Sequence, residues 1–270
     1  MIRLYPHQEK FISEIRAAFH KHKSVLAHAP VGFGKTIISA WMGKRILEKN
    51  NTMFFCVHTK DLLRQTYMTF HKFNIHYGII AAGNQANKSL IQICSMNTLQ
   101  KRLNKYKAPS LLIIDEAHFA CAKGWAKVIE HYKAQGSYVL GLSASPWRLS
   151  GEGLGKHFDV MIHGPATRWL IDNKYLSEYR IFAPSHPNLE NVHIRAGDFV
   201  QNEIEPIMNK PSIVGDAIAH YKKHCNNKKT IAFCCSVEHS KFMSAQFNAN
   251  GITASHLDGE CDNEYRKKII

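Results

Sequence analysis

Several features are missing from this sequence, and each absence excludes a class of protein. Its seven cysteines form no C-x-x-C pair, which leaves zinc binding and thioredoxin-type redox chemistry without support. Their odd number and irregular spacing fit a reducing compartment, and we expect a cytoplasmic protein. The N-terminus has no apolar signal region and no long apolar run follows it, so we expect neither secretion nor a membrane partner.

Acidic residues are scarce relative to basic ones. The chain of 270 residues has 35 Lys and Arg against 21 Asp and Glu, a formal charge of +14. Such an excess favours an anionic partner, with nucleic acid first and an acidic membrane surface second. Composition alone also fits a basic soluble enzyme. The 17 histidines occur without matching carboxylate or cysteine ligands, so a metal site built on histidine is not indicated.

Short apolar runs alternate with amphipathic stretches up to about residue 165. This alternation predicts an α/β fold, a parallel sheet with helices on both faces. Leu111–Ile114 is apolar at every position, as expected of a central strand that is covered on both sides. Ligands of such sheets bind beyond the carboxyl ends of the strands. The predicted strands are Ser24–His28, Thr52–Val57, Tyr77–Ala81, Leu90–Cys94, Leu111–Asp115 and Tyr138–Ser143.

The pattern divides the chain into three parts. Residues 1–165 form the first domain, and the proline-containing residues 166–211 form a connecting segment. Residues 212–270 begin a second domain, which looks unfinished because its two predicted strands make a poor sheet on their own. Its predicted elements are the helices Ser212–Cys225 and Glu238–Asn250 and the strands Thr230–Cys235 and Thr253–His256.

The segment Ala29–Thr36 has the pattern of a phosphate-binding loop between a strand and a helix. Gly32 and Gly34 allow the tight backbone that directs N–H groups toward phosphates. Lys35 is then expected to reach the β- and γ-phosphates of ATP, and the Thr36 hydroxyl to bind Mg²⁺. The strict pattern begins with glycine, whereas this loop begins with Ala29, and a chance match in an ordinary loop is the alternative.

Two acidic residues, Asp115 and Glu116, follow the apolar strand Leu111–Ile114. A carboxylate at the tip of a buried strand is suited to hold Mg²⁺ through water, which is the role predicted for Asp115. Glu116 is then expected to orient or deprotonate the attacking water. The alternative interpretation is a helix start with acidic residues in its first turn.

With these motifs, the sequence resembles the DEAH-box and related helicases of superfamily 2. Leu4–Gln8 resembles their adenine-reading motif, which implies base recognition by Gln8. Asp115–His118 resembles motif II and Ser143–Pro146 resembles motif III, so His118, Ser143 and Ser145 are implied to couple hydrolysis to strand movement. His58–Gln65 and Ile93–Leu99 resemble the motifs that touch the nucleic-acid backbone, through Thr59, Lys60, Ser95 and Thr98.

The resemblance implies a RecA-like P-loop NTPase domain, ATP and Mg²⁺ as cofactors, and a partial second RecA-like lobe. The segment from Pro146 to Arg148 and Tyr175-Leu176 resemble bacterial and phage members near DNA-repair helicases and restriction-enzyme motors, so DNA is favoured over RNA. Thr230–Ser236 resembles motif IV, but no counterpart of motifs V and VI follows.

Motif VI supplies arginines that contact the γ-phosphate, a contribution of about 10³–10⁵ in rate for phosphoryl transfer. We therefore expect an ATP-dependent helicase or translocase whose chain binds ATP, hydrolyses it poorly and does not unwind. A partner chain that supplies the missing motifs would restore the enzyme activity. The alternative is a non-enzymatic, nucleotide-responsive nucleic-acid-binding protein or a fragment of a split gene.

Overall fold

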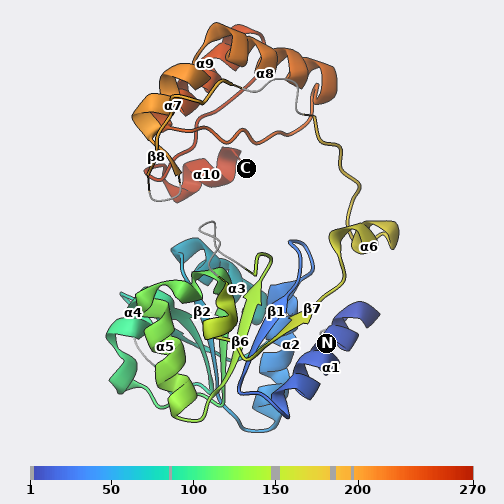
Figure 1. Cartoon of the computed structure of the whole chain (residues 1–270), viewed down its shortest axis with the longest axis vertical. Coiled ribbons are helices and arrows are strands. Elements are labelled where there is room, and N and C mark those ends of the chain that lie inside the picture. Colours follow the sequence, from blue (N-terminus) through green and yellow to red (C-terminus); the bar gives the residue numbers. More distant parts are fainter. Residues whose placement is uncertain (1–2, 85–86, 147–152, 183–186, 196–197, 270) are drawn as a thin grey trace. The chain divides into compact units, whose positions relative to one another are not determined.

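The computed structural model describes residues 3–84, 87–146, 153–182, 187–195 and 198–269 (Figure 1). The chain divides into two units, Met1–Glu178 and Tyr179–Ile270, which we call unit 1 and unit 2 and describe separately. Residues 166–178 belong to unit 1, although the sequence placed them in the connecting segment. They include the short helix α6 (Thr167–Asp172).

Unit 1 is built on a parallel sheet of seven strands in the order β3-β4-β2-β5-β6-β1-β7, which confirms the predicted α/β fold. β7 had not been predicted, because its alternating burial is typical of an edge strand rather than of a fully covered one. The strands are β1 (Ser24–His28), β2 (Met53–Val57), β3 (Gly78–Ile80), β4 (Ile91–Ser95), β5 (Leu111–Asp115), β6 (Tyr138–Ser143) and β7 (Val160–His163).

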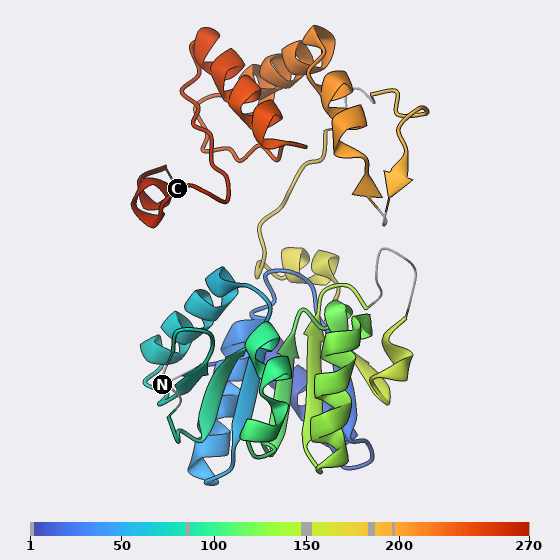
Figure 2. The ribbon, with the colours of Figure 1, turned by 90° about the vertical axis from the view of Figure 1, so that its left-hand side faces the viewer.

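Helices cover both faces of this sheet (Figure 2). One hydrophobic core joins one face to α1 (Pro6–Phe19), α2 (Lys35–Glu48) and α3 (Lys60–Lys72). The other core joins the opposite face to α4 (Met96–Lys101) and α5 (Lys123–Ala134). Within β2, Phe55 packs into the first core and Phe54 into the second, as the alternation of side chains along a strand requires. Both rings are buried, and each such burial stabilises the fold by roughly 1.5–3 kcal/mol.

A polar clip fastens β7 to the amino end of β1. The Asp159 carboxylate accepts hydrogen bonds from the backbone N–H groups of Lys23 and Ser24, at 3.0 and 2.9 Å. The Lys133 ammonium lies 2.8 Å from the same carboxylate and donates to the Ser24 hydroxyl. Burial alone would raise the pKa of Asp159, but these hydrogen bonds and the Lys133 charge lower it to about 2. β7 is thereby fixed at the edge of the sheet.

Unit 2 consists mainly of helices: α7 (Gln201–Met208), α8 (Pro211–His224), α9 (Val237–Ala249) and α10 (Asn263–Ile269). α8 and α9 confirm the two helices predicted in this region. The antiparallel pair β8 (Ile194–Arg195) and β9 (Asp198–Phe199) precedes α7. α7 and this strand pair lie in the segment for which the sequence indicated only a connection.

The two strands predicted in unit 2 are wrong. Thr230–Cys235 and Thr253–His256 are not paired as strands in the described part of the chain. The apolar composition of the first segment indicated a buried strand, but Phe233 is 95% exposed and Ile231 76% exposed. A strand exists only where a neighbour pairs with its backbone, and a local apolar run cannot supply that neighbour.

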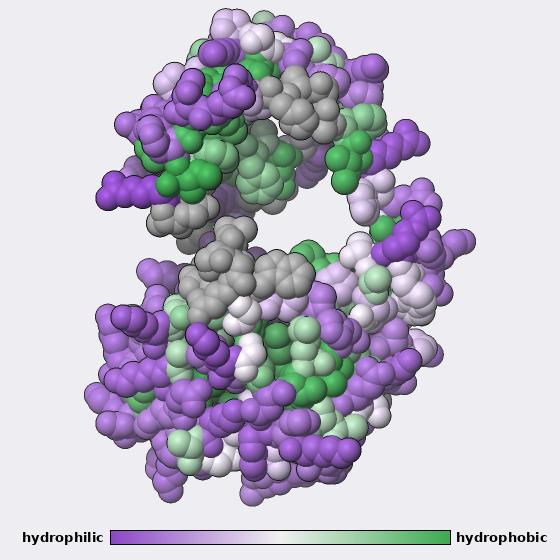
Figure 3. Space-filling view, in the orientation of Figure 1, coloured by the Kyte–Doolittle hydropathy of each residue, from purple (hydrophilic) through white to green (hydrophobic). Residues whose placement is uncertain are grey.

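Within the described ranges, none of the helices has the length and apolar composition needed to cross a membrane. On the visible face of unit 2, hydrophobic residues coloured green lie among polar ones (Figure 3). The exposed hydrophobic residues of this unit include Ile194, Ile231, Phe233, Val237 and Phe242.

Candidate functional site

The predicted phosphate loop lies between β1 and α2, at the carboxyl edge of the sheet. Gly32 and Gly34 have φ angles of +81° and +90°, a conformation in which a Cβ atom is strained. A Cβ atom on Gly34 would also lie 2.8 Å from the side-chain nitrogen of Gln8, and one on Gly32 would lie 2.7 Å from a methyl carbon of Leu176. The loop therefore requires glycine at both positions.

Gln8 is buried in the first turn of α1 and is bonded at both ends of its amide. Its Oε1 accepts from the backbone N–H of Tyr5 at 3.0 Å, and its Nε2 donates to the carbonyl of Phe33 at 2.8 Å. The predicted base-reading residue is thus attached directly to the phosphate loop. One N–H and one lone pair of the amide remain for a nucleobase.

The Lys35 ammonium bends back onto its own loop. It donates to the carbonyls of Ala29 and Pro30, at 3.1 and 3.2 Å. Burial lowers the pKa of this amine, while the charges of Glu116 and Asp115 act in the opposite direction. The structure therefore brings the lysine and the two acidic residues into one electrostatic cluster, as the sequence predicted.

Asp115 is buried at the end of β5, and Glu116 follows in the left-handed region with φ of 52°. Burial and the neighbouring Glu116 charge raise the pKa of Asp115 to about 6. Such a carboxyl group binds a proton readily when no cation is near, and a cation such as Mg²⁺ would displace that proton. The unusual backbone of Glu116 is a feature often found at functional sites.

His118 links Glu116 to the turn that follows β6. Its Nδ1 lies 3.2 Å from the Glu116 carboxylate and 3.4 Å from the Ser143 hydroxyl. Ser143 donates its own proton to the carbonyl of Ser145 at 2.7 Å and accepts from the Ser145 N–H. The Ser143 oxygen must therefore accept from His118, so Nδ1 of His118 carries a proton. The three predicted coupling residues are in contact.

The predicted nucleic-acid contacts differ in exposure. Thr59 and Lys60 are exposed at the start of α3, where the Thr59 hydroxyl accepts from the N–H of Leu62 at 3.1 Å. Ser95 is half-buried at the end of β4, and Thr98 is buried in α4. All four roles remain predictions. Of the segment after motif III, residues 147–152 lie outside the described residues.

An aromatic cluster next to Gln8 had not been predicted as part of the site. The Tyr175 ring lies 4.3 Å from the His7 ring and 5.0 Å from the Tyr5 ring, centroid to centroid. Trp169 joins the cluster through His7 at 5.7 Å. Leu176, the next residue after Tyr175, packs beside the phosphate loop, 2.7 Å from the position that a Cβ atom on Gly32 would take. The spacing of aromatic residues in the sequence gives no sign of this contact, which spans about 170 positions.

ATP and Mg²⁺ fit the residues present. The loop offers backbone N–H groups and Lys35 to phosphates, and Thr36 in the first turn of α2 and Asp115 offer the oxygen ligands that Mg²⁺ prefers. Mg²⁺ is usually held through one or two carboxylates and the phosphates themselves. The described residues contain no group of three or more His, Cys, Asp or Glu side chains suited to a metal. Binding of Mg²⁺ through one or two carboxylates and the phosphates does not require such a group.

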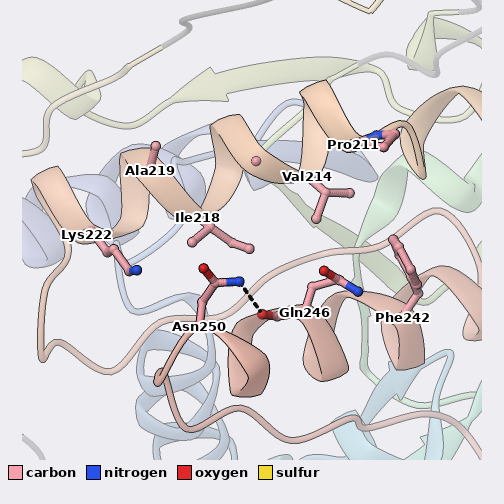
Figure 4. A pocket seen from close by; sticks show the side chains of 9 residues that line it. Pro211, Val214, Ile218, Ala219, Lys222, Phe242, Gln246 and Asn250 are labelled. Carbon is pink, nitrogen blue, oxygen red and sulfur yellow. Dashed lines mark hydrogen bonds between the residues drawn. The ribbon is translucent and has the colours of Figure 1, made fainter.

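Unit 2 has a groove of its own. It has a volume of about 510 Å³ and is lined by residues of α8 and α9 and by Asn250 (Figure 4). Val214, Ile218 and Phe242 give it an apolar wall, and Asn250 donates to the carbonyl of Gln246 at 2.9 Å. It contains none of the predicted site residues.

The family match and the similar proteins relate this chain to superfamily 2 helicases and restriction-enzyme motors. Residues 1–148 match the family described as type III restriction enzyme, res subunit, and the chain belongs to this family. The likeness confirms the resemblance inferred from the motifs.

Similar proteins include viral and fungal ones. A 51.5 kDa protein of a Lactococcus phage (isolate 7-9) is 31% identical over 245 residues, which cover 91% of this chain and 51% of the phage protein. The putative ATP-dependent helicase IRC3 of Saccharomyces cerevisiae is 25% identical over 260 residues, covering 88% and 38%. The chain thus spans about half or less of the length of these relatives.

Two solved structures share the fold. The UvsW helicase of bacteriophage T4 matches with a TM-score of 0.51 and 17% identity, over 59% of each chain. A nuclease-deletion mutant of the type ISP restriction-modification enzyme LlaGI matches with a TM-score of 0.53 and 12% identity, over 90% of this chain and 26% of the other. These likenesses confirm a RecA-like α/β fold.

Proposed function

We propose that this chain carries the ATP-binding domain of an ATP-dependent helicase or translocase that acts on DNA. The observation that carries the proposal is the cluster of Lys35, Asp115 and Glu116 at one edge of the sheet, next to a loop whose glycines have positive φ angles. Nucleotide chemistry requires all of these parts in one place. We further propose a cytoplasmic location, since Cys56 and Cys94 are free buried thiols.

Each residue of the cluster has a proposed role. The loop and Lys35 bind the phosphates, Thr36 and Asp115 hold Mg²⁺, and Glu116 orients or deprotonates the attacking water. Gln8 recognises adenine through the part of its amide that remains available. Bound Mg²⁺ would neutralise phosphate charge during the reaction.

DNA is the proposed partner on the basis of charge and family. The formal charge of +14 favours a polyanion, and Thr59 and Lys60 are exposed at the start of α3, where they could meet a backbone phosphate. Contacts of this kind are largely independent of base sequence and weaken steeply with salt. The fold neighbour LlaGI was solved with a DNA substrate mimic, and we propose a DNA substrate for this chain as well.

A second candidate is a nucleotide-responsive binding protein that needs further polypeptide before it can turn over ATP. The exposed side chains of Ile231 and Phe233 favour it, because an extended apolar segment of this kind gains stability when strands pair beside it. The added polypeptide would supply the motifs V and VI that the resemblance calls for, in the same chain or in a partner chain.

The test is ATP hydrolysis with and without double-stranded DNA, single-stranded DNA and RNA. Lys35→Ala removes the phosphate-binding amine, and Lys49→Ala, at the far end of α2, is the matched control. Turnover that DNA stimulates and only the Lys35 change abolishes supports the motor. Nucleotide binding without turnover supports the second candidate, and absence of nucleotide binding would refute both.

A further inference from the structure

Two histidines meet at the carboxyl ends of neighbouring strands. His28 ends β1 and His163 ends β7, and the strand register places them opposite each other. Their Nδ1 atoms are 3.2 Å apart, and Nε2 of His28 lies 3.1 Å from the carbonyl oxygen of Ala144. His28 is 135 positions from His163 in the sequence and 116 positions from Ala144. Neither histidine was predicted to belong to the site.

The direction of these hydrogen bonds follows from the carbonyl. The Ala144 oxygen can only accept, so Nε2 of His28 must carry a proton. In the neutral ring Nδ1 of His28 is then an acceptor, and Nδ1 of His163 must be the donor. The bonds run from His163 to His28 and from His28 to Ala144. His163 thus holds His28 in the tautomer that can donate to Ala144.

Ala144 is the centre of the turn that orients His118. Its neighbour Ser143 contacts His118, which in turn contacts Glu116. On the other side, the N–H of Ala29, the first residue of the phosphate loop, donates to the carbonyl of Ser143 at 3.0 Å. His28 therefore stands where the phosphate loop and the turn after β6 join.

We propose that His28 and His163 are positioning residues for ATP hydrolysis. They hold the turn Ser143–Ser145 so that His118 keeps Glu116 oriented toward the attacking water. The positioning role rests on the proposed ATP hydrolysis at this site. The direction of the hydrogen bonds does not depend on it. Neither histidine belongs to the groups assigned to phosphates or Mg²⁺, so the pair should affect the rate of the chemical step more than nucleotide affinity.

Substitutions can separate the hydrogen bond from packing. His28→Gln places an N–H donor at a similar distance from the backbone, whereas His28→Leu keeps similar volume without a donor. We expect His28→Leu to lower the single-turnover rate of ATP hydrolysis roughly tenfold, the effect of one lost positioning hydrogen bond. Binding of a fluorescent ATP analogue should change less than about twofold, and His28→Gln should recover most of the rate. His20→Leu, at an exposed histidine, is the control.

The tautomers provide a measurement that does not depend on turnover. Nitrogen-15 NMR of the histidine rings in the full chain should show His28 protonated at Nε2 and His163 protonated at Nδ1, the less common form of neutral histidine. His163→Leu should leave His28 protonated at Nε2, because the Ala144 carbonyl still accepts from it. The Nδ1 signal of His28 should shift, because this nitrogen loses its donor.

The outcomes separate this inference from the proposed function. His163 protonated at Nε2, or equal rates in His28→Leu and His28→Gln, would overturn the positioning pair even in an active motor. Absence of turnover in the unaltered chain, together with the expected tautomers, would refute hydrolysis by this chain and the positioning role with it, while the hydrogen-bonded pair itself would stand. If His28→Leu does not fold, the tautomers of the unaltered chain and the ring signals of His163→Leu decide the question.

Discussion

The clip at Asp159 provides a direct test of how unit 1 holds its edge strand. Asp159→Asn keeps the size of the side chain but removes its charge and turns one acceptor into a donor. That donor then faces the Lys133 ammonium or the backbone N–H groups of Lys23 and Ser24, which are donors themselves. We expect unit 1 to lose stability.

The size of the loss follows from the pKa of Asp159. A decrease from 3.8 to about 2 corresponds to an upper value of roughly 2.4 kcal/mol at about 1.36 kcal/mol per unit. The side chain is 35% exposed, and solvent screening reduces this to about 1 kcal/mol. For a unit of this size, about 1 kcal/mol lowers the melting temperature by roughly 2–4 °C.

The pH dependence has a definite sign. The folded-state pKa is lowered, so the stabilisation is present above the unfolded value of about 4 and is lost as the pH falls through about 2. Thermal unfolding of the original chain and Asp159→Asn should differ most at neutral pH, and the difference should fall to about half near pH 3. The control is Asp172→Asn, which breaks an exposed ion pair with Arg168. A difference that does not change with pH, or an equal loss in the control, would refute the reasoning.

Three further predictions concern the site. Gly34→Ala should weaken nucleotide binding at least tenfold, about 1.4 kcal/mol, because the residue has a φ of +90° and its Cβ would meet Gln8. Binding of a fluorescent ATP analogue measures this loss. The control, Gly153→Ala, should bind normally because its Cβ meets open space. Since the pKa of Asp115 is about 6, apparent Mg²⁺ affinity should rise roughly tenfold between about pH 5 and pH 7; the reasoning fails if Asp115→Asn retains that rise. DNA affinity should fall with salt at a slope of about −0.9 per phosphate neutralised, and Lys60→Ala should reduce the slope by about one; an unchanged slope would remove Lys60 from the interface.

The sheet and the phosphate loop could be predicted because their signals are local. A strand covered on both faces is apolar throughout, and Leu111–Asp115 forms β5 with the predicted bounds. Glycine followed by Lys35 and a helical pattern is equally local. β7 was missed because its apolar run, Val160–Ile162, is only three residues long; at the sheet edge Met161 is 38% exposed.

The contacts that depend on strand order could not be predicted. His28 meets Ala144 only because β6 pairs beside β1, and it meets His163 only because β7 pairs on the other side. The sequence gives neither neighbour. The same limit explains the wrong strand at Thr230–Cys235, where an apolar run is present but none of the described residues pairs with it as a strand.

Strand order also explains how the parts of the site act together. The phosphate loop follows β1 and the acidic pair follows β5, and these two strands are not adjacent, since β6 lies between them. The turn Ser143–Ser145 at the end of β6 therefore touches both neighbours, through Ala29 on one side and His118 on the other. Under the proposed function, Lys35 leaves its own carbonyls for a phosphate, and we expect the resulting shift of the loop to change the contacts of that turn. We therefore propose that the middle strand transmits nucleotide binding to Glu116, and that the hydrogen bonds of His28 set how firmly that turn is held.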